Sequence, residues 1–222
     1  MTISSTSFRS ISNLTDWLVK FSIAMIILSI ISVAASSYQA VSVEYDPQSD
    51  NIYAVIGIFT GIISILLGII LLFWYYRATK NIHSFGAKEV TSPRMAVIWW
   101  FIPIAVLWKP YQVTQQIWKA SNPEIKLING TEWKNTPNSK LVKLWWFLTL
   151  ASIFGSIAIS LGSGVLLYNS NQDLFRESIQ ATLLQSIVTI PFLILGIIST
   201  IYFIRVIKQI STWQYQKSIG LV

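Results

Sequence analysis

The chain has no cysteine and only one histidine, His83, among its 222 residues. Without thiols it can form no disulfide, thiolate metal site or cysteine nucleophile. One imidazole cannot supply the paired ligands of a bundle-type haem or a histidine-rich metal site. We therefore expect neither a metal nor any other cofactor.

Charge is also scarce, at 11% of residues against about 25% in a typical soluble domain. It is absent from four long apolar runs, at residues 21–43, 52–76, 144–168 and 179–204. An α-helix needs about 20 residues to cross a bilayer, and one charge at the bilayer centre costs roughly 2.5–3.5 kcal/mol. The sequence therefore predicts an all-α membrane protein with four transmembrane helices, arranged as two hairpins.

These runs divide the chain into parts of one polytopic membrane domain, residues 1–222. We predict a first hairpin at 17–82, a central segment at 83–142, a second hairpin at 143–210, and a short C-terminal tail at 211–222. This arrangement uses nearly the whole chain and leaves no room for an appended soluble catalytic domain. A cleaved signal peptide is a weaker alternative for the first run, because the apolar stretch continues past the small residues around Val33.

The distribution of basic residues predicts the orientation. With the N-terminus inside, 15 of the 16 Lys and Arg residues fall on the cytoplasmic side, and only Arg176 falls outside. The inside then carries +11 and the outside −4, which returns the net charge of +7. This is the positive-inside pattern, and it predicts a multi-pass protein of the plasma (inner) membrane with both termini cytoplasmic. It also accounts for the basic charge without a nucleic-acid partner.

The two hairpins show weak similarity to each other. A shift of 128 residues aligns Trp17 with Trp145, and YRATKNI with IRVIKQI at the end of each hairpin. If this is a true duplication, the halves form a parallel repeat around an axis along the membrane normal. Small residues at 57, 61, 64 and 68, and at 152, 156, 160 and 164, predict close helix packing within the monomer rather than a pore lining.

The central segment is too short to cross the membrane as a helix. Its apolar part, residues 95–108, has 14 residues and is interrupted by Pro103. A run of that length favours a re-entrant or interfacial segment, and a full crossing would export the lysine-rich stretch that follows. Pro110 then predicts the start of an amphipathic helix. Its apolar face is Tyr111, Thr114, Trp118 and Ser121, and its polar surface is Gln112, Gln115, Gln116 and Lys119.

Three motifs in this region resemble a known family. They are WYYRATKN at residues 74–81, SPRMAVIWWFIPIA at 92–105, and LWKPYQ followed by IWKAS at 107–121. This order is similar to an uncharacterised bacterial membrane family, the domain of unknown function 4328. The resemblance implies a multi-span membrane domain with a tryptophan- and proline-rich signature and no established activity. Family members often carry a glutamate where this chain has Gln116.

Basic and aromatic residues of the same region form the candidate site. Guanidinium groups and stacked rings hold phosphate or carboxylate headgroups, whereas an aromatic belt with snorkelling cations is the structural alternative. We expect binding of anionic lipid at the cytoplasmic face, or of a membrane-protein partner. The candidate residues are Arg77, Lys80, Asn81, Arg94, Trp99, Trp100, Trp108, Lys109, Tyr111 and Trp118.

No nucleophile–base pair, metal constellation or phosphate loop accompanies these residues, so we expect a protein that is not an enzyme. The favoured function is a non-enzymatic binding, scaffold or accessory role. The alternative is a facilitator-type transporter or lipid-handling protein for a neutral or lipid-like substrate, since no intramembrane carboxylate is available for ion coupling.

Overall fold

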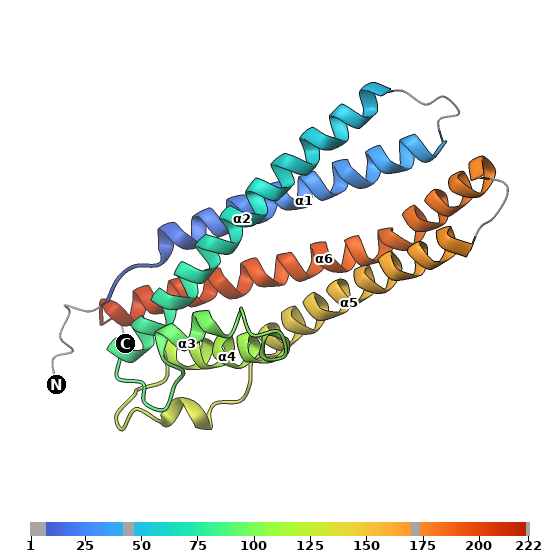
Figure 1. Cartoon of the computed structure of the whole chain (residues 1–222). Coiled ribbons are helices and arrows are strands. Elements are labelled where there is room, and N and C mark those ends of the chain that lie inside the picture. Colours follow the sequence, from blue (N-terminus) through green and yellow to red (C-terminus); the bar gives the residue numbers. More distant parts are fainter. Residues whose placement is uncertain (1–7, 42–46, 170–173, 221–222) are drawn as a thin grey trace. The chain divides into compact units, whose positions relative to one another are not determined.

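The computed structural model describes residues 8–41, 47–169 and 174–220, and the regular secondary structure of these residues is helical, with no strand. The α-helices are α1 Ser12–Val41, α2 Pro47–Ser84, α3 Pro93–Ile98, α4 Lys109–Ser121, α5 Lys140–Asn169 and α6 Leu174–Ser218 (Figure 1). Two 3-10 helices, η1 Ala105–Leu107 and η2 Glu132–Asn135, lie in the central segment. Within these described ranges, four helices are long and apolar enough to cross a membrane: α1, α2, α5 and α6. The all-α prediction with four transmembrane helices is confirmed.

The chain divides into two compact units, and each long helix contributes to both. We call Met1–Phe21, Leu66–Trp146 and Ile201–Val222 the tryptophan-rich unit, and Ser22–Ile65 with Phe147–Thr200 the apolar unit. All ten tryptophans belong to the tryptophan-rich unit. This unit also has 15 basic and four acidic residues (15 − 4 = +11), whereas the apolar unit has one and five (1 − 5 = −4).

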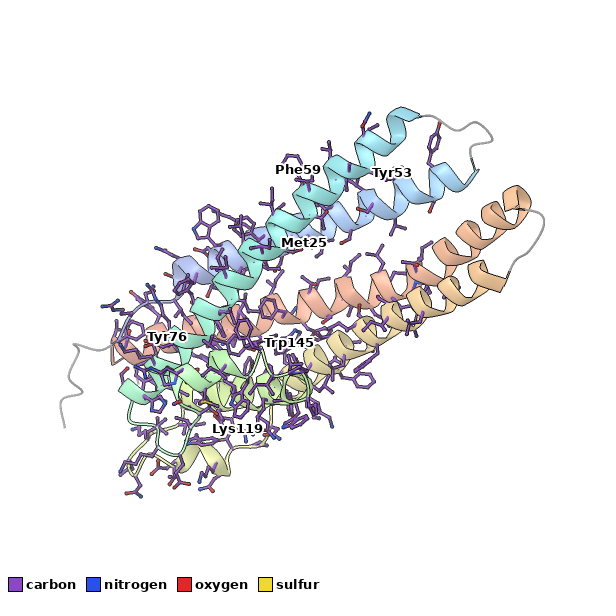
Figure 2. The ribbon with its side chains drawn as sticks, viewed as in Figure 1. Met25, Tyr53, Phe59, Tyr76, Lys119 and Trp145 are labelled. Carbon is purple, nitrogen blue, oxygen red and sulfur yellow. The ribbon has the colours of Figure 1, made fainter. Side chains whose placement is uncertain are left out.

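Within the apolar unit, α1 runs beside α2 and α5 runs beside α6 (Figure 1). Tyr53 Oη donates a hydrogen bond of 2.7 Å to the Ala35 carbonyl and so joins α2 to α1 (Figure 2). The hydroxyls of Thr149 and Ser199 are 2.7 Å apart and join α5 to α6. Polar contacts of this kind hold helices together where lipid offers no hydrophobic drive.

The two stripes of small residues differ in what they contact. On α5, Ser152 of the predicted stripe donates a hydrogen bond to the Phe192 carbonyl of α6 at 3.2 Å. Next to the stripe, a Cβ built on Gly155 would overlap the Phe192 ring, so the helices meet closely there. On α2, nothing lies within 4 Å of a Cβ built on Gly57, Gly61 or Gly68. The prediction of close packing is therefore wrong for these three glycines, whereas the fourth residue of the stripe, Ser64, contacts Met25 of α1 through its hydroxyl. The side chains at 160 and 164 lie outside the described residues.

The aligned halves share some burial but not all. Ile82 and Ile210, which the 128-residue shift superimposes, are both fully buried. Trp17 is 50% exposed, whereas its counterpart Trp145 is 5% exposed. The parallel repeat stays a prediction.

The core of the tryptophan-rich unit comes from α2, α4 and α6 together with the start of α1. Its largest fully buried apolar side chains include Trp74, Tyr75, Ile82, Ile117 and Ile207. Residues 211–218, expected as part of a short tail, instead continue α6 to Ser218. Their polar sequence resembles a tail, but Gln214 is fully buried and the helix end packs within this unit.

Candidate functional site

The central segment folds into short helical pieces and does not form a spanning helix. Ser92 caps α3 by accepting a hydrogen bond from the Met95 amide, and Pro93 occupies the first turn. The six residues of α3 span only about 9 Å at 1.5 Å per residue. Turns and η1 lead from there into α4. Phe101 and Ile104 are 68% and 71% exposed, so this segment presents apolar tips.

A row of aromatic rings runs through the tryptophan-rich unit. Tyr75 packs edge-on against Trp74 at 5.4 Å and against Trp100 at 5.3 Å between ring centroids. Trp100 contacts Trp146, whose indole N–H donates to the Leu107 carbonyl at 2.8 Å. Edge-to-face pairs of this kind contribute about 0.5–1.5 kcal/mol each. The row fixes the central segment against α2 and α5.

A buried polar network joins four segments of this unit. The Gln214 amide nitrogen donates to the Ala78 carbonyl at 3.0 Å and to Ser121 Oγ at 3.1 Å. Its oxygen accepts from Asn81 Nδ2 at 2.8 Å. Asn81 also pairs with the backbone of Arg9, donating to its carbonyl at 2.9 Å and accepting from its amide at 3.2 Å. These hydrogen bonds fix the positions of the N-terminal segment, α2, α4 and α6 relative to one another.

Lys217 caps the end of α4 from α6. Its ammonium donates to the carbonyls of Ala120, Asn122 and Ile125 at 2.9, 3.1 and 2.9 Å. These carbonyls lie at and just beyond the helix end, where backbone acceptors lack intrahelical partners and a cation is favoured. Lys217 is therefore a structural cation.

Three other cations meet at a cleft beside α2. We call it the basic cleft; its volume is about 200 Å³ and it is lined by Arg9, Phe73, Tyr76, Arg77, Lys80 and Asn81. Asn81 fixes the backbone of Arg9 next to α2. Phe73 and Tyr76 are 58% and 38% exposed. Among the described residues the single ion pair joins Lys134 to Glu89, so no carboxylate neutralises these three cations.

A second cleft lies over α4. We call it the Lys119 cleft; its volume is about 280 Å³ and it is lined by Tyr111, Gln112, Gln115, Gln116, Lys119, Trp133 and Asn138. Gln115 exchanges two hydrogen bonds with the backbone of Ser139, at 3.0 and 2.9 Å, and so joins α4 to the start of α5. Gln115 and Lys119 were expected on the polar surface of α4, but both are buried because η2 and the loop before α5 cover that side.

The structure distributes the ten predicted residues over several places. Arg77, Lys80 and Asn81 meet at the basic cleft, and Tyr111 lines the Lys119 cleft. The remaining predicted residues lie outside both clefts. The Lys109 ammonium lies 5.0 Å from the centre of the Trp99 ring, and the Trp118 ring packs on Trp213 with 4.7 Å between ring centroids. Trp100 belongs to the aromatic row. Trp108 is 42% exposed, and Arg94 is also exposed.

Sequence reasoning missed Arg9 as a neighbour of Arg77 and Lys80. Arg9 and Arg77 are 68 residues apart in the sequence, and the Asn81 bonds to the Arg9 backbone are among the contacts that bring the two regions together. It also missed Gln214 and Lys217, which follow the last apolar run. Their burial could have been predicted from the sequence, because Gln214 and Lys217 follow Ile207 and Ile210 at three- and four-residue intervals. Such spacing places all four residues on one face of a helix.

The apolar helices and the tryptophan-rich unit define a multi-pass membrane protein. A family model described as a domain of unknown function, DUF4328, matches residues 38–212, so the chain belongs to this family. No curated protein and no solved structure matches the chain. At Gln116, the side-chain oxygen accepts a hydrogen bond from the Thr91 amide at 2.9 Å, and a glutamate there would accept the same bond.

Proposed function

We propose that this chain is a non-enzymatic binding or accessory protein that holds an anionic lipid headgroup in its basic cleft. The observation that carries this proposal is that Arg9, Arg77 and Lys80 line one cleft whose described residues include no carboxylate. Guanidinium groups bind phosphate oxygens with paired hydrogen bonds, and a lysine adds a point charge. Phe73 and Tyr76 line the same cleft and are exposed, which suits the boundary between headgroup and acyl chain.

The proposed setting is the plasma (inner) membrane, with both termini and the tryptophan-rich unit on the cytoplasmic side. The +11 charge of that unit supports this orientation, and so does the gathering of tryptophans in it. The exposed tips Phe101 and Ile104 support an interfacial or re-entrant position for the central segment. A membrane-protein partner with an acidic surface is the alternative occupant of the basic cleft.

The headgroup proposal is tested by comparing two arginines. Arg77→Gln should weaken binding of anionic phosphatidylglycerol by about fivefold, because one basic residue near an anionic surface contributes about 1 kcal/mol. Arg94→Gln removes the same charge from an exposed arginine outside the cleft and should leave binding within about twofold. Native mass spectrometry of the protein, titrated with phosphatidylglycerol and then phosphatidylcholine, measures both. Equal losses in the two variants would indicate a general surface attraction and reject the cleft.

The orientation is tested with introduced cysteines, because the chain has none of its own. Tyr38 in the apolar unit is 78% exposed, and Ile128 in the loop after α4 is 83% exposed. In intact cells a membrane-impermeant thiol reagent should label Tyr38→Cys, whereas Ile128→Cys should react only after permeabilisation. The reverse pattern would overturn the cytoplasmic orientation.

A further inference from the structure

The Lys119 cleft has an unusual balance of charge. Lys119 is only 8% exposed, and no described residue offers an acceptor within hydrogen-bond distance of its ammonium. The stem of Lys119 is buried, whereas its ammonium opens into the cleft, and no carboxylate among the residues that line the cleft serves as its counterion. Burial lowers the pKa of Lys119, and no carboxylate opposes that effect.

Two acidic residues of the tryptophan-rich unit, Glu89 and Glu132, already have partners. Glu89 pairs with Lys134. Glu132 directly precedes Trp133, which lines the cleft. The two carboxylate oxygens of Glu132 accept hydrogen bonds from the backbone amides of Asn129 and Gly130 at 2.6 and 2.9 Å. The Asn129 amide is the main reason that the pKa of Glu132 lies below its usual value. Neither carboxylate lines the cleft to serve as a counterion to Lys119.

Other groups in the cleft are mostly neutral donors. Gln116 uses its oxygen for the Thr91 amide, which leaves its NH₂ group available. The hydroxyl of Tyr111 and the amides of Gln112 and Asn138 have no partner among the described residues. Trp133 commits its indole N–H to the Lys88 carbonyl at 3.0 Å, so its ring acts as an apolar wall. The cleft thus offers one positive charge, several donors and an aromatic surface.

We infer that the Lys119 cleft binds a small organic monocarboxylate, with the carboxylate at Lys119 and the Gln116 amide and the organic part against Trp133 and Tyr111. One ammonium balances one negative charge, whereas a phosphate dianion would leave an excess negative charge in a cleft without arginine. The volume of about 280 Å³ lies at the small end of ligand pockets. This site shares no residue with the basic cleft, so the two proposals can fail separately.

The experiment uses the full chain in lipid nanodiscs and isothermal titration with sodium benzoate, its neutral analogue benzamide, and inorganic phosphate. Benzoate should bind, and benzamide and phosphate should each bind at least about tenfold more weakly, since a hydrogen bond to a charged group is lost or the charges no longer match. No benzoate binding, or equal binding of benzamide, would overturn the proposal. Tighter binding of phosphate would overturn the carboxylate assignment.

Two variants and a control locate the binding. Lys119→Met removes the ammonium and should weaken benzoate binding at least about tenfold. Gln116→Glu keeps an acceptor for the Thr91 amide, so the local fold is retained, but it places a carboxylate three residues before Lys119 on α4 and should weaken benzoate equally. Lys126→Met removes an exposed cation outside the cleft and should change nothing. Unchanged benzoate binding in Gln116→Glu would reject this site.

Discussion

Replacing Gln214 with leucine should lower the thermal midpoint of the tryptophan-rich unit by about 6–12 °C. The substitution keeps the volume but removes three hydrogen bonds, to Asn81, Ala78 and Ser121. Gln214 and Ser121 are fully buried and Asn81 is 1% exposed, so water cannot replace the lost partner. Leaving buried polar groups unsatisfied costs about 1–3 kcal/mol each, and about 3 kcal/mol in total gives the expected shift for a chain of this size.

Gln216→Leu is the matched control for this prediction. Gln216 lies two residues further along α6, is only half-buried, and forms no hydrogen bond with the described residues. Its midpoint should stay within about 2 °C, because such substitutions change stability by about 0.5 kcal/mol or less. Intrinsic fluorescence measures the transition, since all ten tryptophans belong to this unit. Equal shifts in both variants would show that the buried network contributes nothing specific.

The second large effect is expected at Gly155 in the apolar unit. Gly155→Ala should destabilise the packing of α5 on α6, although alanine is the better helix former by about 1 kcal/mol. The added methyl group would overlap the Phe192 ring, and overpacking of this kind costs about 1–3 kcal/mol. Gly57→Ala, where nothing lies within 4 Å, should be neutral or stabilising.

A double variant tests whether the Phe192 ring is the cause. Gly155→Ala combined with Phe192→Leu should recover part of the loss, because a smaller side chain leaves room for the methyl group. The measurement is the midpoint of helix loss by circular dichroism, since the apolar unit has no tryptophan. If Gly155→Ala proves as stable as Gly57→Ala, the close approach of the two helices is not present.

The four spanning helices were predictable because a helix that crosses a bilayer needs about 20 consecutive apolar residues, and such a run is visible in the sequence. The interior of the tryptophan-rich unit was not predictable in this way. Asn81 was predicted as a candidate headgroup- or partner-binding residue, but its hydrogen-bond partners are Arg9, 72 residues before it, and Gln214, 133 residues after it. Helical periodicity also predicted that Lys119 lies on the exposed surface of α4. Periodicity describes one helix by itself, so it could not predict the loop that covers this side of α4.

The position of Gln214 also bears on how the protein is made. Synthesis proceeds from the N-terminus, so α1, α2, α4 and α5 exist before residues 214 and 217 are added. Until then Asn81 and Ser121 lack their shared partner, and the carbonyls at the end of α4 lack the Lys217 ammonium. The tryptophan-rich unit is therefore complete only after residues 214 and 217 have been synthesised. A nascent chain that has not reached residue 214 therefore leaves the buried side chains of Asn81 and Ser121 without this partner.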